Sequence, residues 1–270
     1  MQHLTIEVCA STLQSCLAAL ESGADRVELC SALAEGGVTP SYALIKAACA
    51  LEGLRVHVLI RPRGGDFCYS QAEVALMCED IRCCRRLGAQ GVVIGALTPE
   101  GELDAEAIRP LILAATEPID AAPTPTSAHP LTLVFHRAFD CCRDPKSALE
   151  QLVAWGFDTV LTSGQAATAP EGAALLTSLV HQAAGRIHIM AGSGINPSNA
   201  AALARATGVD ALHLSARALV KSPSTFYPKG ANPPSFGGVT HIPNFDYYAS
   251  SAPLITQVIQ TVNHPNHDES

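Results

Sequence analysis

Short apolar runs alternate with longer amphipathic stretches along most of the chain. The runs span five to seven residues, are rich in valine, isoleucine and leucine, and lie between turn residues, which is typical of strands. We predict eight strands, at residues 4–9, 26–30, 54–60, 91–95, 131–135, 158–162, 186–190 and 210–214. This strand–helix alternation predicts a parallel sheet. In a chain of 270 residues the best solution is closure into a single (β/α)8 barrel.

Local chemistry marks where four helices should begin. Residues 70–73 (SQAE) and 168–171 (TAPE) have the spacing of capping boxes, in which two side chains cap each other's backbone N–H groups. Residues 144–145 (DP) and 196–197 (NP) each place a capping side chain before a proline, which is favoured at the first position of a helix. We therefore predict helix starts at these four places, and an amphipathic helix over 71–87.

Three segments interrupt the alternation. Residues 118–130 are rich in proline and predict a surface insertion before the fifth strand. Residues 221–248 predict a long irregular loop before a last helix at about 250–262, and this loop is either a lid over the barrel mouth or a flexible connection. The tail 264–270 is predicted to be disordered. The expected organisation is one domain over residues 1–270.

The composition limits the partners and the compartment. A net charge of −8 and a pI near 5.6 do not favour nucleic acid or anionic membranes, and no apolar run reaches the roughly 18–20 residues of a membrane span. The N-terminal sequence lacks a secretory signal pattern, so a cytoplasmic protein with reduced thiols is expected. Most of the ten cysteines, including Cys78 and Cys84 on the apolar face of 71–87, are predicted core residues.

Polar residues occupy strand positions that should face the barrel interior. Strand side chains alternate between the lumen and the helical layer, and Ile6, Val8, Val27 and Leu29 suit the helical layer. The same alternation turns inward Glu7, Cys9, Glu28, Cys30, His57, Arg61, Thr132, His136, His188, His213 and Ser215. An inert barrel would instead be filled mainly with aliphatic side chains.

Residues at or just past the carboxyl ends of these strands are candidates for acid–base chemistry, because active sites of this fold lie at that end. A glutamate can act as general base, a histidine as general acid or second base, and an arginine can stabilise negative charge. The catalytic candidates are Glu7, Glu28, Arg61 and His136. The alternative is a buried ion-pair network that only fixes strand register, which we favour for the deeper residues His57 and His188.

Two Glu-x-Cys motifs lie on the first two strands, at residues 7–9 and 28–30. Neighbouring strands are about 4.8 Å apart, so Cys9 and Cys30 are candidates to share one ion on the same side of the barrel. A thiolate pair selects Cu(I), which needs no tetrahedral ligand set. Two neighbouring buried cysteines without a ligand are the alternative, because burial is the usual fate of cysteine.

A glycine-rich stretch, residues 191–196 (AGSGIN), follows the seventh strand. Backbone N–H groups just before a helix bind anions, and the loops after strands seven and eight often bind phosphate in this fold. Thr162-Ser163-Gly164 belongs to the neighbouring strand end. The anion-binding candidates are Arg63, Arg137, Ser163, Gly192, Ser193 and Gly194. A tight turn also requires glycine, so the ligand stays open.

The chain resembles the copper homeostasis protein CutC family from Thr5 to Ala216. The motifs that carry the resemblance are residues 23–41 (GADRVELCSALAEGGVTPS), 60–70 (IRPRGGDFCYS), 135–140 (FHRAFD), 161–168 (LTSGQAAT), 191–196 (AGSGIN) and 212–216 (LHLSA). The resemblance implies a barrel, a cytoplasmic location, a homodimer or larger homo-oligomer, and Cu(I) binding through Cys9 and Cys30. The chain departs from the family pattern in the 118–130 insertion, in Cys141 where methionine is usual, and after Ala216.

Three functions therefore stay open. A binding protein would hold Cu(I) with Cys9 and Cys30, and no organic cofactor is implied. A barrel enzyme would act on a small anionic or phosphorylated metabolite with glutamate and histidine chemistry. A scaffold would influence copper through a partner protein, which nothing in the sequence favours.

Overall fold

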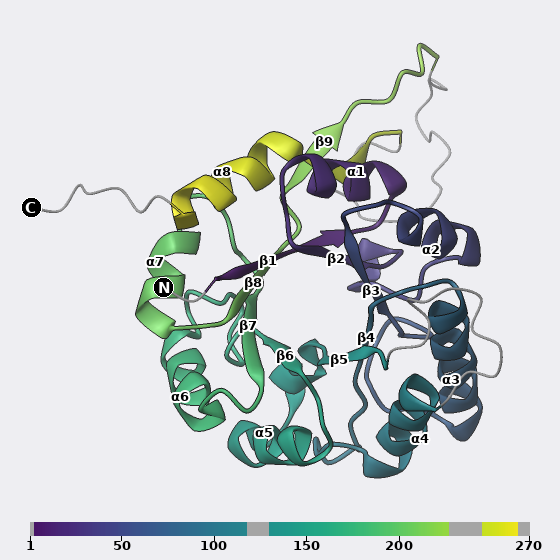
Figure 1. Ribbon diagram of the computed structural model, residues 1–270, viewed down its shortest axis with the longest axis vertical. Helices are drawn as coiled ribbons and strands as arrows, with labels where there is room; N and C mark the ends of the chain where they lie inside the picture. The colour runs from purple at the N-terminus through teal and green to yellow at the C-terminus, as the bar shows by residue number, and fades with distance from the viewer. Residues whose placement is uncertain (1–2, 118–129, 227–244, 264–270) are drawn as a thin grey trace, which may run out of the picture.

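Eight parallel strands close into a barrel in the order β1 to β8, and β8 pairs with β1 (Figure 1). This topology confirms the predicted (β/α)8 fold. The strands are β1 (Thr5–Ala10), β2 (Arg26–Leu29), β3 (Arg55–Leu59), β4 (Gly91–Ile94), β5 (Thr132–Phe135), β6 (Thr159–Thr162), β7 (His188–Gly192) and β8 (Ala211–Leu214). The helices are α1 (Leu13–Glu21), α2 (Tyr42–Cys49), α3 (Gln71–Arg86), α4 (Ala105–Thr116), α5 (Pro145–Ala154), α6 (Ala173–Ala183), α7 (Ala200–Thr207) and α8 (Ala252–Asn263).

The computed structural model describes residues 3–117, 130–226 and 245–263. The predicted insertion at 118–130 lies outside the described residues except for its last position. The centre of the predicted 221–248 loop and the whole predicted tail at 264–270 also lie outside them.

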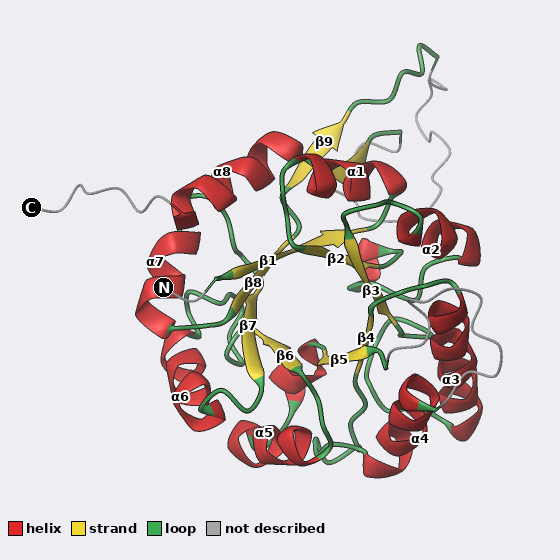
Figure 2. Cartoon of the chain, viewed as in Figure 1, coloured by secondary structure: helices red, strands yellow, loops and turns green. Residues whose placement is uncertain are grey.

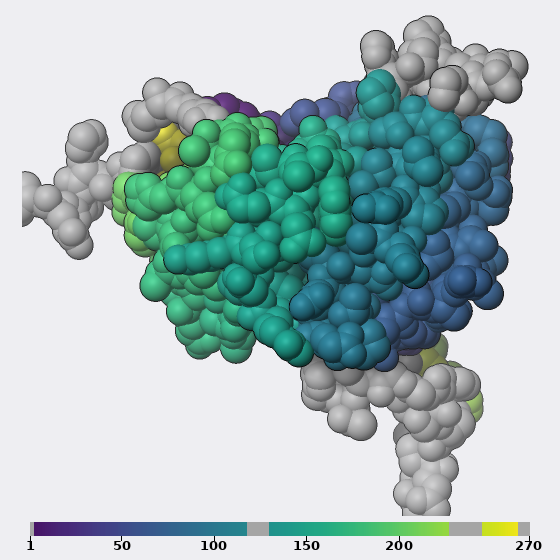
Figure 3. Space-filling model, turned by 90° about the horizontal axis from the view of Figure 1, so that it is seen from below, coloured from purple at the N-terminus to yellow at the C-terminus, as the bar shows by residue number. Residues whose placement is uncertain are grey.

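Side chains pack in two layers, one inside the barrel and one between the barrel and its helices. The helices form the outer ring in Figure 2, and α4, α5 and α6 cover the strands on the side of the molecule seen in Figure 3. The outer layer includes Ile6, Val8, Val27 and Leu29, so the predicted alternation of β1 and β2 is confirmed. Cys78 and Cys84 also pack there, as predicted core residues. The inner layer holds Cys9, Cys30, Leu59, Val93, Val134, Leu161, Met190 and Ala211.

Two of the four predicted helix starts are confirmed. Ser70 and Glu73 form the capping box of α3, and Asp144 caps α5 with proline at its first turn. The other two helices begin later than predicted, α6 at Ala173 and α7 at Ala200.

Local packing explains both late starts. A Cβ atom on Gly172 would lie 1.9 Å from the Ser163 carbonyl oxygen, so this close backbone approach fixes residues 168–172 as a turn ahead of α6. Before α7, the Asn196 side chain accepts the Ser198 N–H and Asn199 Oδ1 accepts the Asn196 N–H, which also makes a turn.

A two-stranded antiparallel ribbon follows the barrel and was not predicted. It consists of β9 (Arg217–Val220) and β10 (Tyr247–Ser250), and it lies beside α1 in Figure 1. The Ser250 N–H donates to Ser15 Oγ at 3.0 Å, and the Arg217 guanidinium lies 5.5 Å from the Tyr248 ring centre. The end of the predicted irregular segment is therefore a strand anchored to the barrel. None of the described helices has the length and apolar character needed to cross a bilayer.

Candidate functional site

A buried charged network surrounds the carboxylate of Glu7, inside the barrel on β1. Arg26, at the start of β2, donates its Nε–H to Glu7 Oε2 at 2.5 Å, and His213 Nδ1 on β8 lies 2.8 Å from Glu7 Oε1. His57 Nδ1 lies 3.9 Å from Oε2. Burial alone would raise the pKa of Glu7, but Arg26 and His213 outweigh it and hold that pKa far below its ordinary value. Glu7 is therefore a buried anion between cationic partners.

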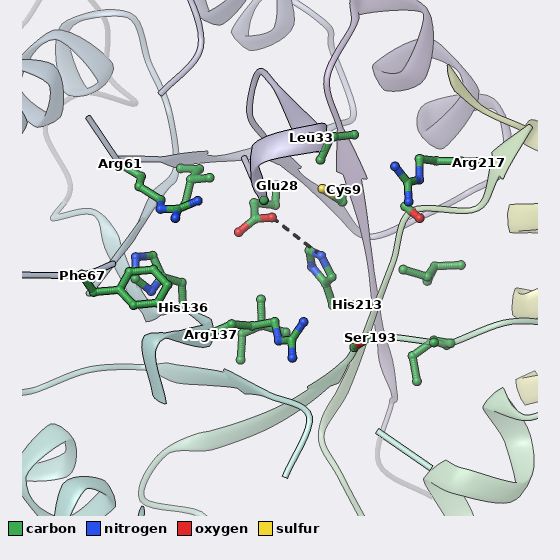
Figure 4. Close-up of a pocket in the computed structure, with 17 residues that line it drawn as sticks. Cys9, Glu28, Leu33, Arg61, Phe67, His136, Arg137, Ser193, His213 and Arg217 are labelled. Atoms are coloured by element: carbon green, nitrogen blue, oxygen red, sulfur yellow. Dashed lines mark ion pairs between the residues drawn. The ribbon is translucent and has the colours of Figure 1, made fainter. Parts of the chain in front are cut away.

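His213 connects this network to Glu28 on β2. Its Nε2 lies 3.7 Å from Glu28 Oε2, the pair joined by the dashed line in Figure 4. Burial alone would lower the pKa of His213, but Glu28, Cys9 and Glu7 raise it well above its ordinary value. Burial in turn raises the pKa of Glu28. The geometry thus places an imidazolium between two carboxyl groups, of which Glu28 is the more easily protonated.

The thiols of Cys9 and Cys30 lie next to this pair, with 3.7 Å between the two Sγ atoms. The staggered register of the barrel sets Cys9 opposite Glu28, so the two Glu-x-Cys motifs are offset by two residues rather than level. The Cys9 Sγ, a Glu28 oxygen and a His213 nitrogen all lie within 4.8 Å of one another. The hydrogen bond with Cys30, and burial, raise the pKa of Cys9 well above its ordinary value. These atoms form the donor set of a candidate metal site.

Arg61, Phe67 and His136 lie together on another side of the site, as Figure 4 shows. The Phe67 ring centre is 5.0 Å from the Arg61 guanidinium carbon and 5.0 Å from the His136 ring centre. Burial, together with the nearby Arg61 charge, lowers the pKa of His136 to about 3, so its imidazole is neutral at physiological pH. A Cβ atom on Gly95 would lie 2.5 Å from His136, so only glycine leaves space for this ring.

Asp140 organises the ends of β5 and β6. Its carboxylate accepts the Thr162 hydroxyl, the Ser163 N–H and hydroxyl and the Gln165 N–H, and it pairs with Arg137 Nε at 2.7 Å. Arg137 Nη2 also donates to Ser163 Oγ at 3.0 Å. The Ser163 and Gln165 N–H groups that follow β6 are therefore already occupied by a carboxylate of the protein itself, and the Gly164 N–H by the Thr162 hydroxyl.

These side chains surround a cavity of about 450 Å³ at the C-terminal mouth of the barrel. Among the sequence-predicted site residues, the cavity brings together Cys9, Glu28, Arg61, His136, Arg137, Ser193 and Gly194. In the part of the chain that the structure describes, the backbone N–H groups of Ser193 and Gly194 donate no hydrogen bond. Ser193 adopts a left-handed φ of 81°, a conformation that is rare for residues other than glycine.

Five predicted site residues do not line this cavity: Glu7, Cys30, Arg63, Ser163 and Gly192. Glu7 lies below it in the charged network, and Cys30 lies behind Cys9 with no exposed surface. Arg63 pairs with Glu73 at 2.6 Å and with Asp66 at 3.1 Å, away from the cavity. The interpretation of His188 as part of a buried network is wrong: at the first position of β7 it is exposed, because the strand begins at the edge of the barrel.

The cavity also contains residues that were not among the predicted site residues: Phe67, His213, Ser215 and Arg217. The alternation of β8 had indicated that His213 points inward, but only the closed barrel shows that it joins Glu7 to Glu28. Arg26 lies two positions before Glu28 on β2, so strand alternation turns its side chain inward as well. It was not among the predicted site residues. No local signal in the sequence indicates that Phe67 belongs to the site.

The buried histidines should make the protein sensitive to acid. Burial lowers the pKa of His57 to about 4, whereas an unfolded histidine titrates near 6.5. The unfolded state then binds more protons than the folded state between these values, so stability falls as pH drops through this window. In the unmodified chain this titration should make the free energy of unfolding fall by about 1.4 kcal/mol per pH unit between pH 6.5 and 4.5, as measured by urea unfolding. We expect His57→Gln to remove this contribution. An unchanged slope in the variant would show that His57 is protonated in the folded protein.

The fold and the cavity together define a class of protein. The chain is a (β/α)8 barrel with a polar cavity at the end of the barrel where proteins of this fold place their sites.

A model of the CutC family matches residues 4–218, and the chain belongs to that family. It is 44% identical over 263 residues to a family protein CutC of Bacteroides thetaiotaomicron, with 97% of this chain and 99% of the relative covered. It is 49% identical to a family protein CutC of Pasteurella multocida, covering 79% of this chain and 82% of the relative.

Solved structures agree with this assignment. A Streptococcus agalactiae structure that bears the name copper homeostasis protein CutC is 36% identical and superimposes with a TM-score of 0.71 over 79% of this chain and 99% of its own. A phosphoribosylanthranilate isomerase of Thermotoga maritima, 13% identical with a TM-score of 0.52 over 97% of this chain and 99% of its own, shares the fold alone.

Proposed function

We propose that this protein takes part in copper homeostasis by holding Cu(I) between Cys9 and Cys30. The observation that carries the proposal is the 3.7 Å separation of the two Sγ atoms. A thiolate-bound ion lies about 2.3 Å from each sulfur, so sulfurs closer than about 4.6 Å can share one ion. Two thiolates suit the soft Cu(I) ion, and the Glu28 carboxyl lies within reach as a third donor or a proton acceptor. His213 would have to lose a proton before its free nitrogen could bind the ion.

The chemistry of the pair determines how such a site would behave. The Cys9 thiol is protonated before metal arrives, because its hydrogen bond with Cys30, together with burial, raises its pKa and favours the neutral form. Binding would therefore release protons and strengthen as pH rises. Cys9 lines the cavity whereas Cys30 lies behind it, so the ion would reach Cys9 first.

A competition titration tests this function. The fully reduced protein is titrated with Cu(I) under anaerobic conditions against a chelator, beside the Cys9→Ser, Cys30→Ser and double variants. We expect tight binding in the unmodified chain and a loss of roughly 100-fold or more in each variant, since removing a ligand should cost more than removing an outer-shell partner. The matched control is Cys16→Ser/Cys84→Ser, which alters two other fully buried thiols. Equal affinity in all of these proteins would exclude the site.

A second candidate is an enzyme acting on a small anionic metabolite. The observation that favours it is Glu28, a carboxyl group 5% exposed that lines the cavity, has a raised pKa and lies beside His213. Such a carboxyl, held by burial in reach of a ligand in the cavity, is suited to take up and release a proton. The reduced protein would be incubated with a mixture of small phosphorylated and carboxylated metabolites and followed by mass spectrometry. A compound consumed by the unmodified chain but not by Glu28→Gln supports an enzyme, and no consumption counts against it.

The assignment to the family also supports a cytoplasmic homodimer or larger homo-oligomer built from one barrel domain per chain. Light scattering on the purified protein measures the assembly directly, and a monomer at all concentrations would contradict it.

A further inference from the structure

Arg61 is a buried cation that forms no ion pair with any carboxylate of the described residues. It is 5% exposed, and its Nη atoms donate to the carbonyl oxygens of Glu35, Gly37 and Gly65 at 2.9, 2.9 and 2.7 Å. Within residues 3–117, 130–226 and 245–263, no carboxylate forms an ion pair with it, and its Nε–H has no hydrogen-bond partner. A buried charge without a counter-charge is costly. The side chain is therefore held in place by backbone carbonyls while its charge stays available.

His136 presents a second donor without a partner. Its Nδ1 accepts the Ala138 N–H at 3.1 Å, so that nitrogen carries no proton. The neutral ring then carries its proton on Nε2, which makes Nε2 a hydrogen-bond donor rather than a base. The ring is 4% exposed, and its Nε2 has no partner among the described residues. His136 is thus oriented by the backbone with an unused N–H.

The two unused donors belong to one wall of the cavity. Arg61 and His136 both line it and both pack against the Phe67 ring. The other buried arginines differ: Arg26 is paired with Glu7, and Arg85, whose Nε also lacks a partner, does not line the cavity. Among the described residues, Arg61 is therefore the buried arginine without an ion pair that lies beside both a second unpartnered donor and space for a ligand.

We propose that Arg61 and His136 form a binding subsite for the oxyanion of a small metabolite, a carboxylate or phosphate group whose oxygens accept the Arg61 Nε–H and the His136 Nε2–H. The positive charge of Arg61 supplies the Coulomb attraction, and the neutral His136 supplies a directed hydrogen bond. The Phe67 ring packs against both side chains and holds them on one wall of the cavity. The subsite extends the second candidate function by naming the chemical class of its ligand, but its occupancy requires neither turnover nor copper.

Anion-dependent thermal unfolding tests the subsite. The reduced full chain is heated in increasing inorganic phosphate or malonate, with sodium chloride at equal ionic strength as reference, and the shifts give a dissociation constant. His136→Asn keeps an oxygen to accept the Ala138 N–H but does not reach the Nε2 position. Losing one charge-assisted hydrogen bond should weaken anion binding by about ten- to a hundredfold in this variant. Arg85→Lys, which alters a buried arginine outside the cavity, should bind like the unmodified chain.

A second measurement covers the case in which a variant is poorly folded. In the unmodified chain labelled with ¹⁵N-histidine, the Nε2–H signal of His136 should move on addition of the anion. A response to phosphate alone indicates a phosphorylated ligand, and a response to malonate alone indicates a carboxylate, and either supports the subsite. No response to either anion, or equal shifts in His136→Asn, overturns it. The enzyme proposal is tested by turnover in Glu28→Gln, and the subsite is tested by anion binding. If Glu28→Gln does not change turnover, the binding result still stands, so the two proposals can fail independently.

Discussion

Replacing Glu7 with glutamine is expected to lower the free energy of unfolding by about 3–5 kcal/mol. Glu7 is fully buried and accepts from Arg26 at 2.5 Å and from His213 at 2.8 Å. The neutral amide keeps the volume of the side chain but leaves Arg26 without its ion-pair partner in the barrel interior, and leaves His213 with only the more distant Glu28 carboxyl at 3.7 Å. Removing one partner of a buried pair costs far more than the pair itself contributes, because the remaining charge stays desolvated.

Urea unfolding at pH 7 measures this change. The urea midpoints of the two proteins are compared where the free energy of unfolding depends equally steeply on urea concentration. Glu150→Gln is the matched control, because Glu150 pairs with Arg186 at 2.8 Å while both side chains are nearly half exposed. This control should change stability little, since exposed ion pairs contribute little. A comparable loss of stability in both variants would mean that burial of the Glu7 network does not determine how much the removal of its charge costs.

Asp140→Asn should have the second largest effect on stability, a loss of about 2–3 kcal/mol. The Asp140 side chain is 8% exposed and accepts hydrogen bonds from Thr162, Ser163 and Gln165 while pairing with Arg137. An asparagine has one acceptor oxygen in place of two and turns an NH₂ group toward donors. At least one backbone or arginine N–H then loses its partner.

The matched control for Asp140→Asn is the same substitution at Asp144. Asp144 caps α5 by accepting the N–H groups of Lys146 and Ser147, and asparagine is an equally good capping residue. Asp144→Asn should therefore unfold at nearly the same urea concentration as the unmodified chain. Equal losses at the two positions would show that Asp140 acts as an ordinary cap rather than as the organiser of the β5 and β6 ends.

The periodicity of the chain was sufficient to predict the barrel. Strand-length apolar runs separated by amphipathic stretches have few stable arrangements at this length, and right-handed parallel crossovers leave a closed sheet as the favoured one. The sequence also predicted that Glu7, Cys9 and Glu28 point into the barrel, because side-chain alternation along a strand is a local property. Capping residues gave the starts of α3 and α5 for the same reason.

Register across the barrel was not readable from the sequence. The strands are staggered, so Cys9 lies opposite Glu28 and Glu7 opposite Arg26, and no local pattern encodes that offset. The late starts of α6 and α7 and the β9–β10 ribbon likewise depend on contacts between residues far apart in the chain.

The sequence by itself therefore determined the fold, the family and the strand ends that supply the polar side chains. Only the tertiary structure decided which of those side chains meet: it set the two sulfurs 3.7 Å apart and placed His213 between Glu7 and Glu28. It also left Arg61 and His136 each with one donor that has no partner among the described residues, beside one cavity. The physical reason is that propensity, capping and alternation act within a few residues, whereas hydrogen-bond satisfaction and charge pairing are settled between strands by closure of the barrel.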